Sequence, residues 1–235
     1  AEQIGELQAK ELVNKLELDK ASSDAPKQIE VLLPYDADDG HDAKTDTSLA
    51  QNIFKGIWKV LEPYFKDGKA ASPSETLTAS TTKDDWRSVA FDSSKAEQIK
   101  SVLAERLDAD KDDSHPVNLD GVISCNDYVA RNIADELDKL GYTGSSADIN
   151  PSISISGIVD SITGKKDLKR QAVPDPAKTS SSDDDSDSDN KENAKWPIIT
   201  GYGAYISPMP NIVNGKQWMT AMENRKALAD DIEQT

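Results

Sequence analysis

The stretch DGVISCNDYVARNIADELDKLGY, residues 120–142, decides the fold class of this chain. A short apolar run from Gly121 to Ser124 stops just before Asn126 and Asp127, which indicates a buried strand. Apolar residues then recur at three- and four-residue steps, as in an amphipathic helix: Val129, Ile133, Leu137 and Leu140. A strand that runs directly into a helix places Asn126 and Asp127 at the edge where open α/β sheets bind ligands.

The polar pair at the start of this helix allows two interpretations. Asn and Asp are preferred at helix N-caps, where a side-chain oxygen accepts a hydrogen bond from a backbone N–H. The same side chains could instead contact a ligand at the sheet edge. The sequence leaves both roles open for Asn126 and Asp127.

The net charge and the hydropathy argue against two classes of partner. Asp and Glu outnumber Lys and Arg by 43 to 27 in 235 residues, which gives a formal net charge of −16. The chain therefore lacks the basic excess that neutralises nucleic-acid phosphates or anionic lipids. It also has no apolar run of membrane-spanning length, so we expect neither nucleic-acid binding nor membrane insertion. The single cysteine, Cys125, is expected to be a buried, unreactive thiol.

Strand and helix patterns alternate along the rest of the chain. Such alternation predicts an α/β fold, with a doubly wound, mostly parallel sheet and helices on both faces. The other expected helices lie at 3–18, 48–65, 93–107 and 207–214, with a further one beginning at 224–234. The other expected strands lie at 29–33, 77–80, 153–159, 196–200 and 217–222.

One segment interrupts the alternation. Residues 179–194, TSSSDDDSDSDNKENA, are rich in Ser and Asp and have no large apolar side chain to bury. We therefore expect a single domain over residues 1–235 with an acidic low-complexity insertion at about 179–194. Ala1 in place of Met, and a helical pattern at the end of the sequence, suggest a piece of a longer chain.

Five parts of the chain, in this order and spacing, resemble a known family. They are IGELQAKELVNKL (4–16), IEVLLPYDADDGHDA (29–43), NIFKGIWKVLEPYFKDGK (52–69), DGVISCNDYVARNIADELDKLGY (120–142), and WPIITGYGA with IVNGKQWMTAMENRKALA (196–204 and 212–229). Together they are similar to the carboxyl-terminal lobe of type I periplasmic sugar-binding proteins. These are the solute receptors of ABC importers, and the xylose, galactose and multiple-sugar receptors are the most similar.

This resemblance implies a function. The chain would bind a small-molecule sugar without a cofactor, and its full-length parent would deliver the sugar to the membrane permease of an ABC importer. The parent would be extracellular or periplasmic and anchored at the cell surface. The amino-terminal lobe of the family is absent from this sequence, so the chain would supply half of a site that closes between two lobes.

Two features depart from the family pattern. Gly201-Tyr202-Gly203 stands where these receptors usually carry Gly-x-Asp, so a carboxylate that would bind sugar hydroxyls is missing. A long insertion, roughly 145–195, also precedes the strand expected at 196–200.

Sugar recognition calls for carboxylates and amides that exchange hydrogen bonds with hydroxyls, and for an aromatic face that covers the ring. Four loops at the carboxyl ends of expected strands offer such groups. The candidates are Asp38, Asp39, His41 and Asp42 in the first loop, Phe91 (or Trp86) with Asp92 in the second, Asn126 and Asp127 in the third, and Tyr202 in the fourth. By resemblance, Asn126 corresponds to the family's ligand-contacting amide, and Phe91 stands where a stacking Trp usually lies.

Each candidate also has a structural interpretation. The acidic run Asp38–Asp42 fits a solvated turn. Trp86 and Phe91 fit a hydrophobic core, since large aromatic side chains are mostly buried. Tyr202, between two glycines, could fill the space that a ligand would otherwise occupy.

The sequence predicts no metal, no cofactor and no enzymatic activity. DADKDD at 108–113 alternates carboxylates as a calcium loop does, but Asp113 and Leu119 stand where the turn Gly and the bidentate Glu are required. His41 and His115 are too few for a convincing metal centre. The chain has neither a Gly-x-Ser-x-Gly nucleophile elbow nor a Gly-x-Gly-x-x-Gly fingerprint.

Two other functions fit the same pattern. The chain could be the ligand-sensing domain of a sugar-responsive transcription regulator, which shares the fold. It could also be a degenerate lobe that no longer binds sugar and serves protein contacts, as Gly203 in place of a carboxylate would allow.

Overall fold

The computed structural model describes residues 1–35, 47–93, 95–107, 116–146, 194–204 and 209–222. Their helices are α1 (Glu2–Leu16), η1 (Leu18–Lys20), α2 (Ser48–Lys66), η2 (Trp86–Ser88), α3 (Ala96–Arg106), α4 (Asp127–Lys139) and α6 (Met209–Val213). Their strands are β1 (Lys27–Val31), β2 (Leu33–Tyr35), β3 (Ala70–Ala71), β4 (Ala90–Asp92), β5 (Gly121–Ile123), β6 (Ile198–Tyr202) and β7 (Met219–Ala221).

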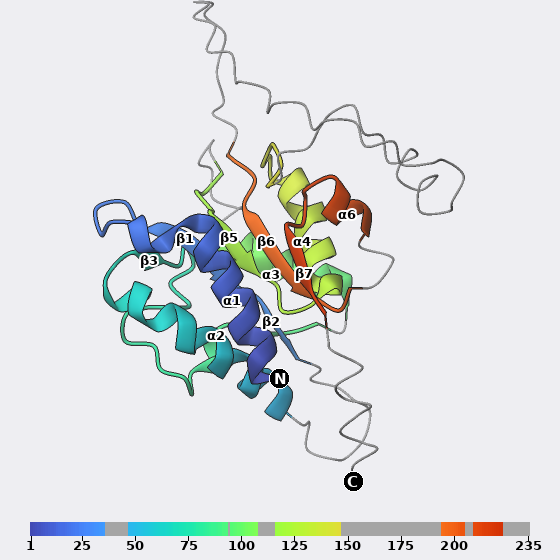
Figure 1. Cartoon of the computed structure of the whole chain (residues 1–235). Helices are drawn as coiled ribbons and strands as arrows, with labels where there is room; N and C mark the ends of the chain where they lie inside the picture. The colour runs from blue at the N-terminus through green and yellow to red at the C-terminus, as the bar shows by residue number, and fades with distance from the viewer. Residues whose placement is uncertain (36–46, 94, 108–115, 147–193, 205–208, 223–235) are drawn as a thin grey trace, which may run out of the picture.

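The described strands form a five-stranded sheet in the order β3-β1-β5-β6-β7 and a two-stranded sheet, β2-β4 (Figure 1). Every pairing between them is parallel. The sheet registers place Ile123 of β5 beside Val31 of β1 and Thr200 of β6, so the carboxyl ends of the three central strands meet at one edge. The sheet confirms the expected fold class.

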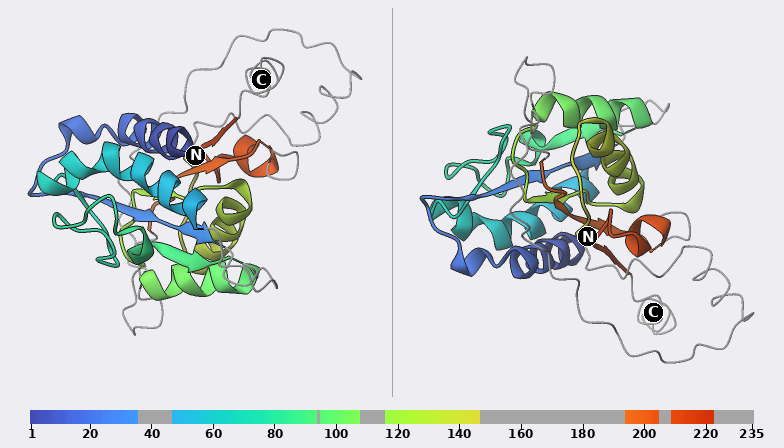
Figure 2. Two further views of the ribbon diagram at one scale, coloured as in Figure 1. Left: turned by 90° about the horizontal axis from the view of Figure 1, so that it is seen from below. Right: turned by 90° about the horizontal axis from the view of Figure 1, so that it is seen from above.

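Helices cover both faces of the sheet (Figure 2). Helices α1 and α2 pack on one face with the side chains of Ile29, Val31 and Ile123. Helices α3 and α4 pack on the other face with Val122 and Ile199. This assignment follows from the two-residue period of a strand, which sends successive side chains to opposite faces. We call the two sides the α1/α2 face and the α3/α4 face.

Helices α1 and α2 approach each other closely because glycine lies at their contact. A Cβ on Gly5 would lie 2.0 Å from the carbonyl oxygen of Ile53, and one on Gly56 would lie 2.0 Å from that of Glu2. No side chain larger than hydrogen fits at either position. The backbones of the two helices are therefore in direct contact at these glycines.

Helix α1 runs antiparallel to the central strands. Leu12, in its second half, lies against Gly121 at the start of β5, where a Cβ would come within 2.8 Å of the leucine side chain. Gln8, in its first half, reaches the carbonyl of Cys125 just beyond the end of β5. The amino end of α1 therefore points to the carboxyl edge of the sheet.

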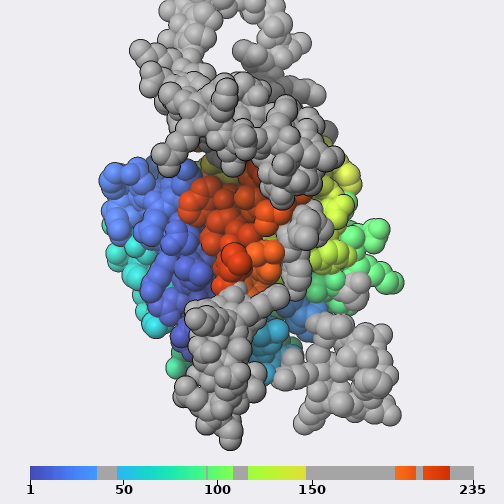
Figure 3. Space-filling view, turned by 45° about the vertical axis from the view of Figure 1, so that its right-hand side comes forward, coloured from blue at the N-terminus to red at the C-terminus, as the bar shows by residue number. Residues whose placement is uncertain are grey.

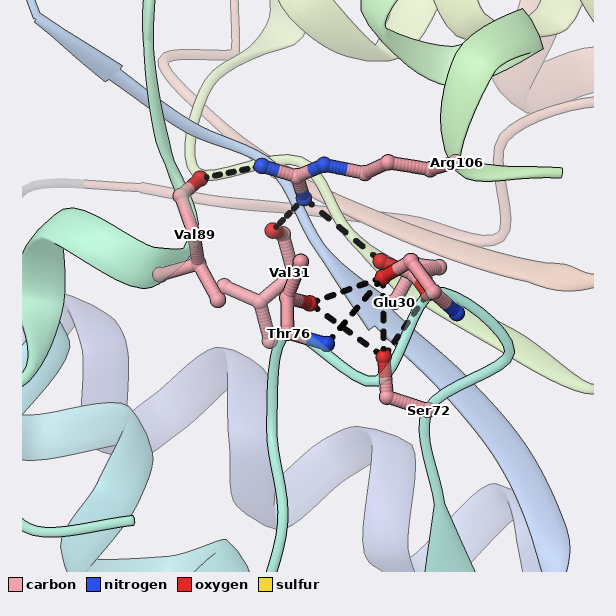
Figure 4. A network of polar contacts seen from close by, with 7 residues as sticks. Glu30, Val31, Ser72, Thr76, Val89 and Arg106 are labelled. Atoms are coloured by element: carbon pink, nitrogen blue, oxygen red, sulfur yellow. Dashed lines mark hydrogen bonds and ion pairs between the residues drawn. The ribbon is translucent and has the colours of Figure 1, made fainter. Parts of the chain in front are cut away.

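A charged pair is buried on the α3/α4 face (Figure 4). Glu30 of β1 is fully buried, and its Oε2 lies 3.5 Å from Nη1 of Arg106 at the end of α3. Oε1 accepts hydrogen bonds from the hydroxyl of Ser72 at 2.8 Å and the backbone N–H of Ser74 at 2.9 Å. The Arg106 guanidinium also donates to the carbonyls of Val31 and Val89, at 2.6 and 2.9 Å. Burial lowers the pKa of Arg106, and the Glu30 carboxylate opposes that shift.

The structure corrects some of the expected elements. The strand expected at 77–80 is wrong, because the backbone there forms turns that hydroxyls bind: the Thr81 hydroxyl accepts from the N–H of Thr78 at 2.9 Å. The strand expected at 29–33 is two strands, β1 and β2, which change partner near Leu32. Strand β4 lies where a loop was expected. The strand expected at 153–159 and the helix at 224–234 lie outside the described residues.

Candidate functional site

The carboxyl edge of the sheet is the natural position for a ligand in this architecture. Strand β5 leads there into α4 through residues 124–126, and the neighbouring strand β6 ends there at Tyr202. Residues 194–204 and 209–222, which include β6, β7 and α6, form an orange and red surface between α1 and α4 (Figure 3).

Asn126 caps helix α4 through one atom of its side-chain amide. Its Oδ1 accepts a hydrogen bond from the backbone N–H of Val129 at 2.8 Å, as in an N-cap. Within the described residues, its Nδ2 donates to no other group, and the side chain is half-buried. Capping therefore uses only one side of the amide, and the –NH₂ group can donate to a ligand.

The residue before Asn126 has an unusual backbone conformation. Cys125 has a φ of 63°, which L-residues rarely adopt. The N–H of Asn126 donates to the carbonyl of Ser124 at 2.8 Å, so the three residues form a tight γ-turn of the strained kind. Burial raises the pKa of the Cys125 thiol far above its usual range, so the thiol is unreactive.

Asp127 lies inside the protein. It is 2% exposed, and both of its carboxylate oxygens accept hydrogen bonds, from Nε2 of Gln217 at 2.8 Å and from the hydroxyl of Thr220 at 2.9 Å. Gly201 makes room for this contact, because a Cβ there would lie 2.6 Å from Oδ1 of Asp127. These bonds tie the start of α4 to β7.

The two aromatic candidates are core residues. Phe91 is 5% exposed and belongs to the core on the α3/α4 face, although it also lines a hollow of about 610 Å³ beside α3. Trp86 is 6% exposed, belongs to the other core and packs edge-to-face on Tyr35 with ring centroids 6.1 Å apart. Asp92 is half-buried and lies opposite Tyr35 in the β2-β4 pair.

Tyr202 is half-buried at the end of β6, on the same edge as Asn126. Its neighbour Gly203 has a φ of 132° and donates its N–H to the carbonyl of Ala221 at 3.0 Å. An aspartate at position 203 could not adopt this backbone without strain. The missing carboxylate is therefore accompanied by a backbone that suits glycine.

The first-loop candidates Asp38, Asp39, His41 and Asp42 lie outside the described residues, as do residues 108–113. In sequence, the first-loop candidates follow β2, which ends at Tyr35. The described residues contain no group of three or more His, Cys, Asp or Glu side chains that could hold a metal ion. None of the described helices is long and apolar enough to cross a bilayer.

Sequence reasoning missed a buried polar group beneath the Asn126 turn. Gln8 and Thr200 are both 0% exposed and bond to each other and to the turn. One signal was available for Gln8: it lies four residues before Leu12, on the side of the helix that the apolar spacing predicts to be buried.

Two solved structures share this architecture. One is an ABC transporter solute-binding protein from Clostridium phytofermentans with bound β-D-glucose. It matches with a TM-score of 0.58 and 16% identity, over 98% of this chain and 49% of that one. The other is a carbohydrate transporter solute-binding protein from Chloroflexus aurantiacus in complex with D-glucose. Its TM-score is 0.56 at 17% identity, over 99% of this chain and 51% of that one.

The chain has the fold of one lobe of a type I periplasmic binding protein. It spans about half the length of the two solute-binding proteins, as a single lobe would. No protein-family model and no curated protein matches the sequence. The likeness to the solved structures confirms the fold that the resemblance implied.

Proposed function

We propose that this lobe is the carboxyl-terminal half of a sugar-binding solute receptor that serves an ABC importer. Its full-length parent would act outside the cytoplasmic membrane and pass the sugar to a membrane permease. The observation that carries the proposal is the Nδ2 of Asn126, which donates to no other group of the described residues and is held at the carboxyl edge of a parallel sheet.

The chemistry of this edge suits a sugar. The amide –NH₂ of Asn126 can donate to a ring hydroxyl, and Tyr202 at the end of β6 offers an aromatic side chain to the same edge. Asp92 and the first-loop candidates Asp38, Asp39, His41 and Asp42 complete the proposed set. Asp127 would support this set from inside by fixing the start of α4, since both its oxygens accept bonds from the protein.

The proposal predicts that this lobe on its own binds sugar weakly. Each exposed hydrogen bond nets about 0.5–1.5 kcal/mol, and a few such bonds must offset the cost of association. We expect the isolated lobe to bind monosaccharides no tighter than about millimolar. The full-length parent, which encloses the ligand, should bind some sugar at least about a hundredfold tighter, or about 2.8 kcal/mol.

Calorimetry of the full-length parent against pentoses, hexoses and disaccharides tests the function. The key variant is Asn126→Ser, which keeps a capping oxygen but removes the –NH₂ donor. We expect it to weaken binding by about 1–3 kcal/mol with little change in melting temperature. Asn118→Ala is the matched control, because Asn118 is exposed beyond the opposite end of β5.

The main alternative is a lobe that has lost its sugar. The absence of a carboxylate at position 203, together with a backbone there that suits glycine, favours it. If no sugar in the panel binds the full-length parent, or if Asn126→Ser binds as well as the unmodified protein, the degenerate lobe replaces the receptor.

A further inference from the structure

We propose that Gln8 and Thr200 are positioning residues that fix the orientation of Asn126 at the carboxyl edge. The inference deepens the proposed function, because it rests on Asn126 as a ligand contact. Neither side chain lies at the edge itself, and both are fully buried beneath it.

The two side chains form a continuous neutral chain of hydrogen bonds up to the turn. Thr200 Oγ1 in β6 donates to Gln8 Oε1 at 3.2 Å, and Gln8 Nε2 in α1 donates to the carbonyl oxygen of Cys125 at 3.3 Å. Gln8 lies 117 residues from Cys125 and 192 residues from Thr200 in sequence, so three distant parts of the chain meet at this turn.

The last acceptor in this series of hydrogen bonds, the carbonyl oxygen of Cys125, belongs to the peptide unit that joins Cys125 to Asn126. The carbonyl of Cys125 and the N–H of Asn126 lie in one rigid plane. Gln8 holds the carbonyl, and Ser124 accepts from the N–H at 2.8 Å, so both ends of the plane are fixed. The direction in which the Asn126 side chain leaves the backbone follows from the orientation of this plane.

The turn needs such support because it is strained. A non-glycine residue with positive φ, such as Cys125, persists only where its surroundings determine it. Thr200 adds a second constraint, because its carbonyl accepts from both the N–H and the hydroxyl of Ser124, at 3.2 and 2.5 Å. The only side-chain bond from α1 to this peptide plane among the described residues is that of Gln8, and the Thr200 hydroxyl holds Gln8 in turn.

The first test follows the Asn126 side-chain amide by ¹⁵N–¹H NMR in the chain as it exists. The signal is assigned by its disappearance in Asn126→Ser. In Gln8→Met and Thr200→Val, which keep side-chain volume but remove the hydrogen bonds, we expect this signal to shift or broaden. Thr200→Ser keeps the hydroxyl and should restore it.

The matched control is Ser146→Ala. Ser146 is 9% exposed, and its hydroxyl donates to the carbonyl of Gly215 at 2.6 Å, next to the segment that leads into β7. Its loss removes one buried hydrogen bond, as Thr200→Val does, but leaves the Asn126 turn intact. We expect a similar fall in melting temperature with the Asn126 signal unmoved.

The second test measures binding of D-glucose, D-galactose and D-xylose to the full-length parent. We expect Gln8→Met to weaken binding about three- to tenfold in the unmodified background and less than twofold in the Asn126→Ser background. A side chain that serves stability alone would change affinity equally in both.

The outcomes separate the two proposals. If no sugar binds, the proposed function fails, but the NMR signal still decides whether Gln8 and Thr200 position Asn126. If Gln8→Met and Thr200→Val lower the melting temperature as Ser146→Ala does and leave the Asn126 signal unmoved, the positioning role is overturned. Should Gln8→Met fail to fold, the Thr200→Val and Thr200→Ser pair decides in the same way.

Discussion

The two faces of the sheet bury polar groups in different ways. On the α1/α2 face, the buried groups are neutral: Gln8 and Thr200, which bond to each other and to the Cys125 carbonyl. On the α3/α4 face, a charged pair is buried: Glu30 and Arg106, surrounded by hydroxyls and carbonyls. The neutral group lies beneath the Asn126 turn, whereas the charged pair joins β1 to α3 and to the segments at Ser72 and Val89.

The difference shows how each network should respond to mutation. Burying a charge is costly unless it is paired, so loss of one partner leaves a large penalty behind. Losing a neutral hydrogen bond costs less, about 1–3 kcal/mol when the other group stays buried. The charged pair should therefore dominate stability, and the neutral network can be altered with the fold intact.

The largest expected effect comes from Arg106→Met. It leaves the carboxylate of Glu30 buried without its cation, and we expect the free energy of unfolding to fall by about 3–5 kcal/mol in urea denaturation. Adding Glu30→Gln should recover most of the loss, because the amide oxygen can still accept from Ser72 and Ser74. Lys20→Ala, which breaks an exposed pair with Glu17, should change nothing measurable. If Arg106→Met proved as mild as Lys20→Ala, the charged pair would not dominate.

The next effect comes from the contact between α1 and α2. Alanine is normally better than glycine inside a helix by about 0.5–1 kcal/mol. Gly56→Ala should instead destabilise by about 1–3 kcal/mol, because the new methyl group meets the Glu2 carbonyl. Thermal and urea unfolding of the single variant decide the sign, and a gain in stability would show that the helices can separate at no cost.

As pH rises, folding stability should be lost first through a group on the α1/α2 face and then through a group on the α3/α4 face. The Cys125 thiol lies in the core of the α1/α2 face, and burial raises its pKa. Tyr142 lies in the core of the other face, where burial raises its pKa to about 12. A raised pKa stabilises the folded state below the unfolded pKa, and this stability is lost as pH rises. The loss should begin near pH 8.5 for Cys125 and near pH 10 for Tyr142.

Unfolding free energies measured at pH 8, 10 and 11.5 test this order. Cys125→Ala should flatten the change between pH 8 and 10, and Tyr142→Phe should flatten the change between pH 10 and 11.5. Identical slopes in the unmodified chain and in Tyr142→Phe would contradict the assignment of the upper step.

The smallest effect is expected from the acidic insertion. Residues 181–194 carry six acidic side chains, at 183, 184, 185, 187, 189 and 192, against one lysine, and their composition offers little to bury. Deleting them should change the free energy of unfolding by less than about 0.5 kcal/mol. A marked fall in melting temperature would show that this segment packs on the domain.

Most of the fold could be predicted because the hydrophobic periodicity of each segment, and the order of strands and helices, can be read directly along the sequence. The run 120–142 gave both β5 and α4, and the N-cap role of Asn126 was one of its two interpretations. Strand β4 was missed because Ala90–Asp92 is only three residues long and shows no alternation. The aromatic candidates Trp86 and Phe91 have the buried positions that their size favoured.

The candidate site was harder to predict because its supports are distant in sequence. Glu30 and Arg106 lie 76 residues apart in sequence. The apolar pattern of a strand does not predict that a glutamate within it is buried in the core. The internal bonds of Asp127 depend on Gln217, just before β7, and on Thr220 within β7, which lie 90 and 93 residues further on. Three-dimensional neighbours of this kind become visible only once the sheet order is known.

The direction of α1 has an electrostatic consequence. Its amino end points to the carboxyl edge, and α4 begins at the same edge with Asn126. Aligned peptide dipoles give each helix amino terminus roughly half a positive charge. A chain of net charge −16 thus has partial positive charge from its backbone amides at this edge. Because peptide groups do not titrate, this partial positive charge stays the same at every pH at which the domain is folded, whereas a charge carried by side chains would change.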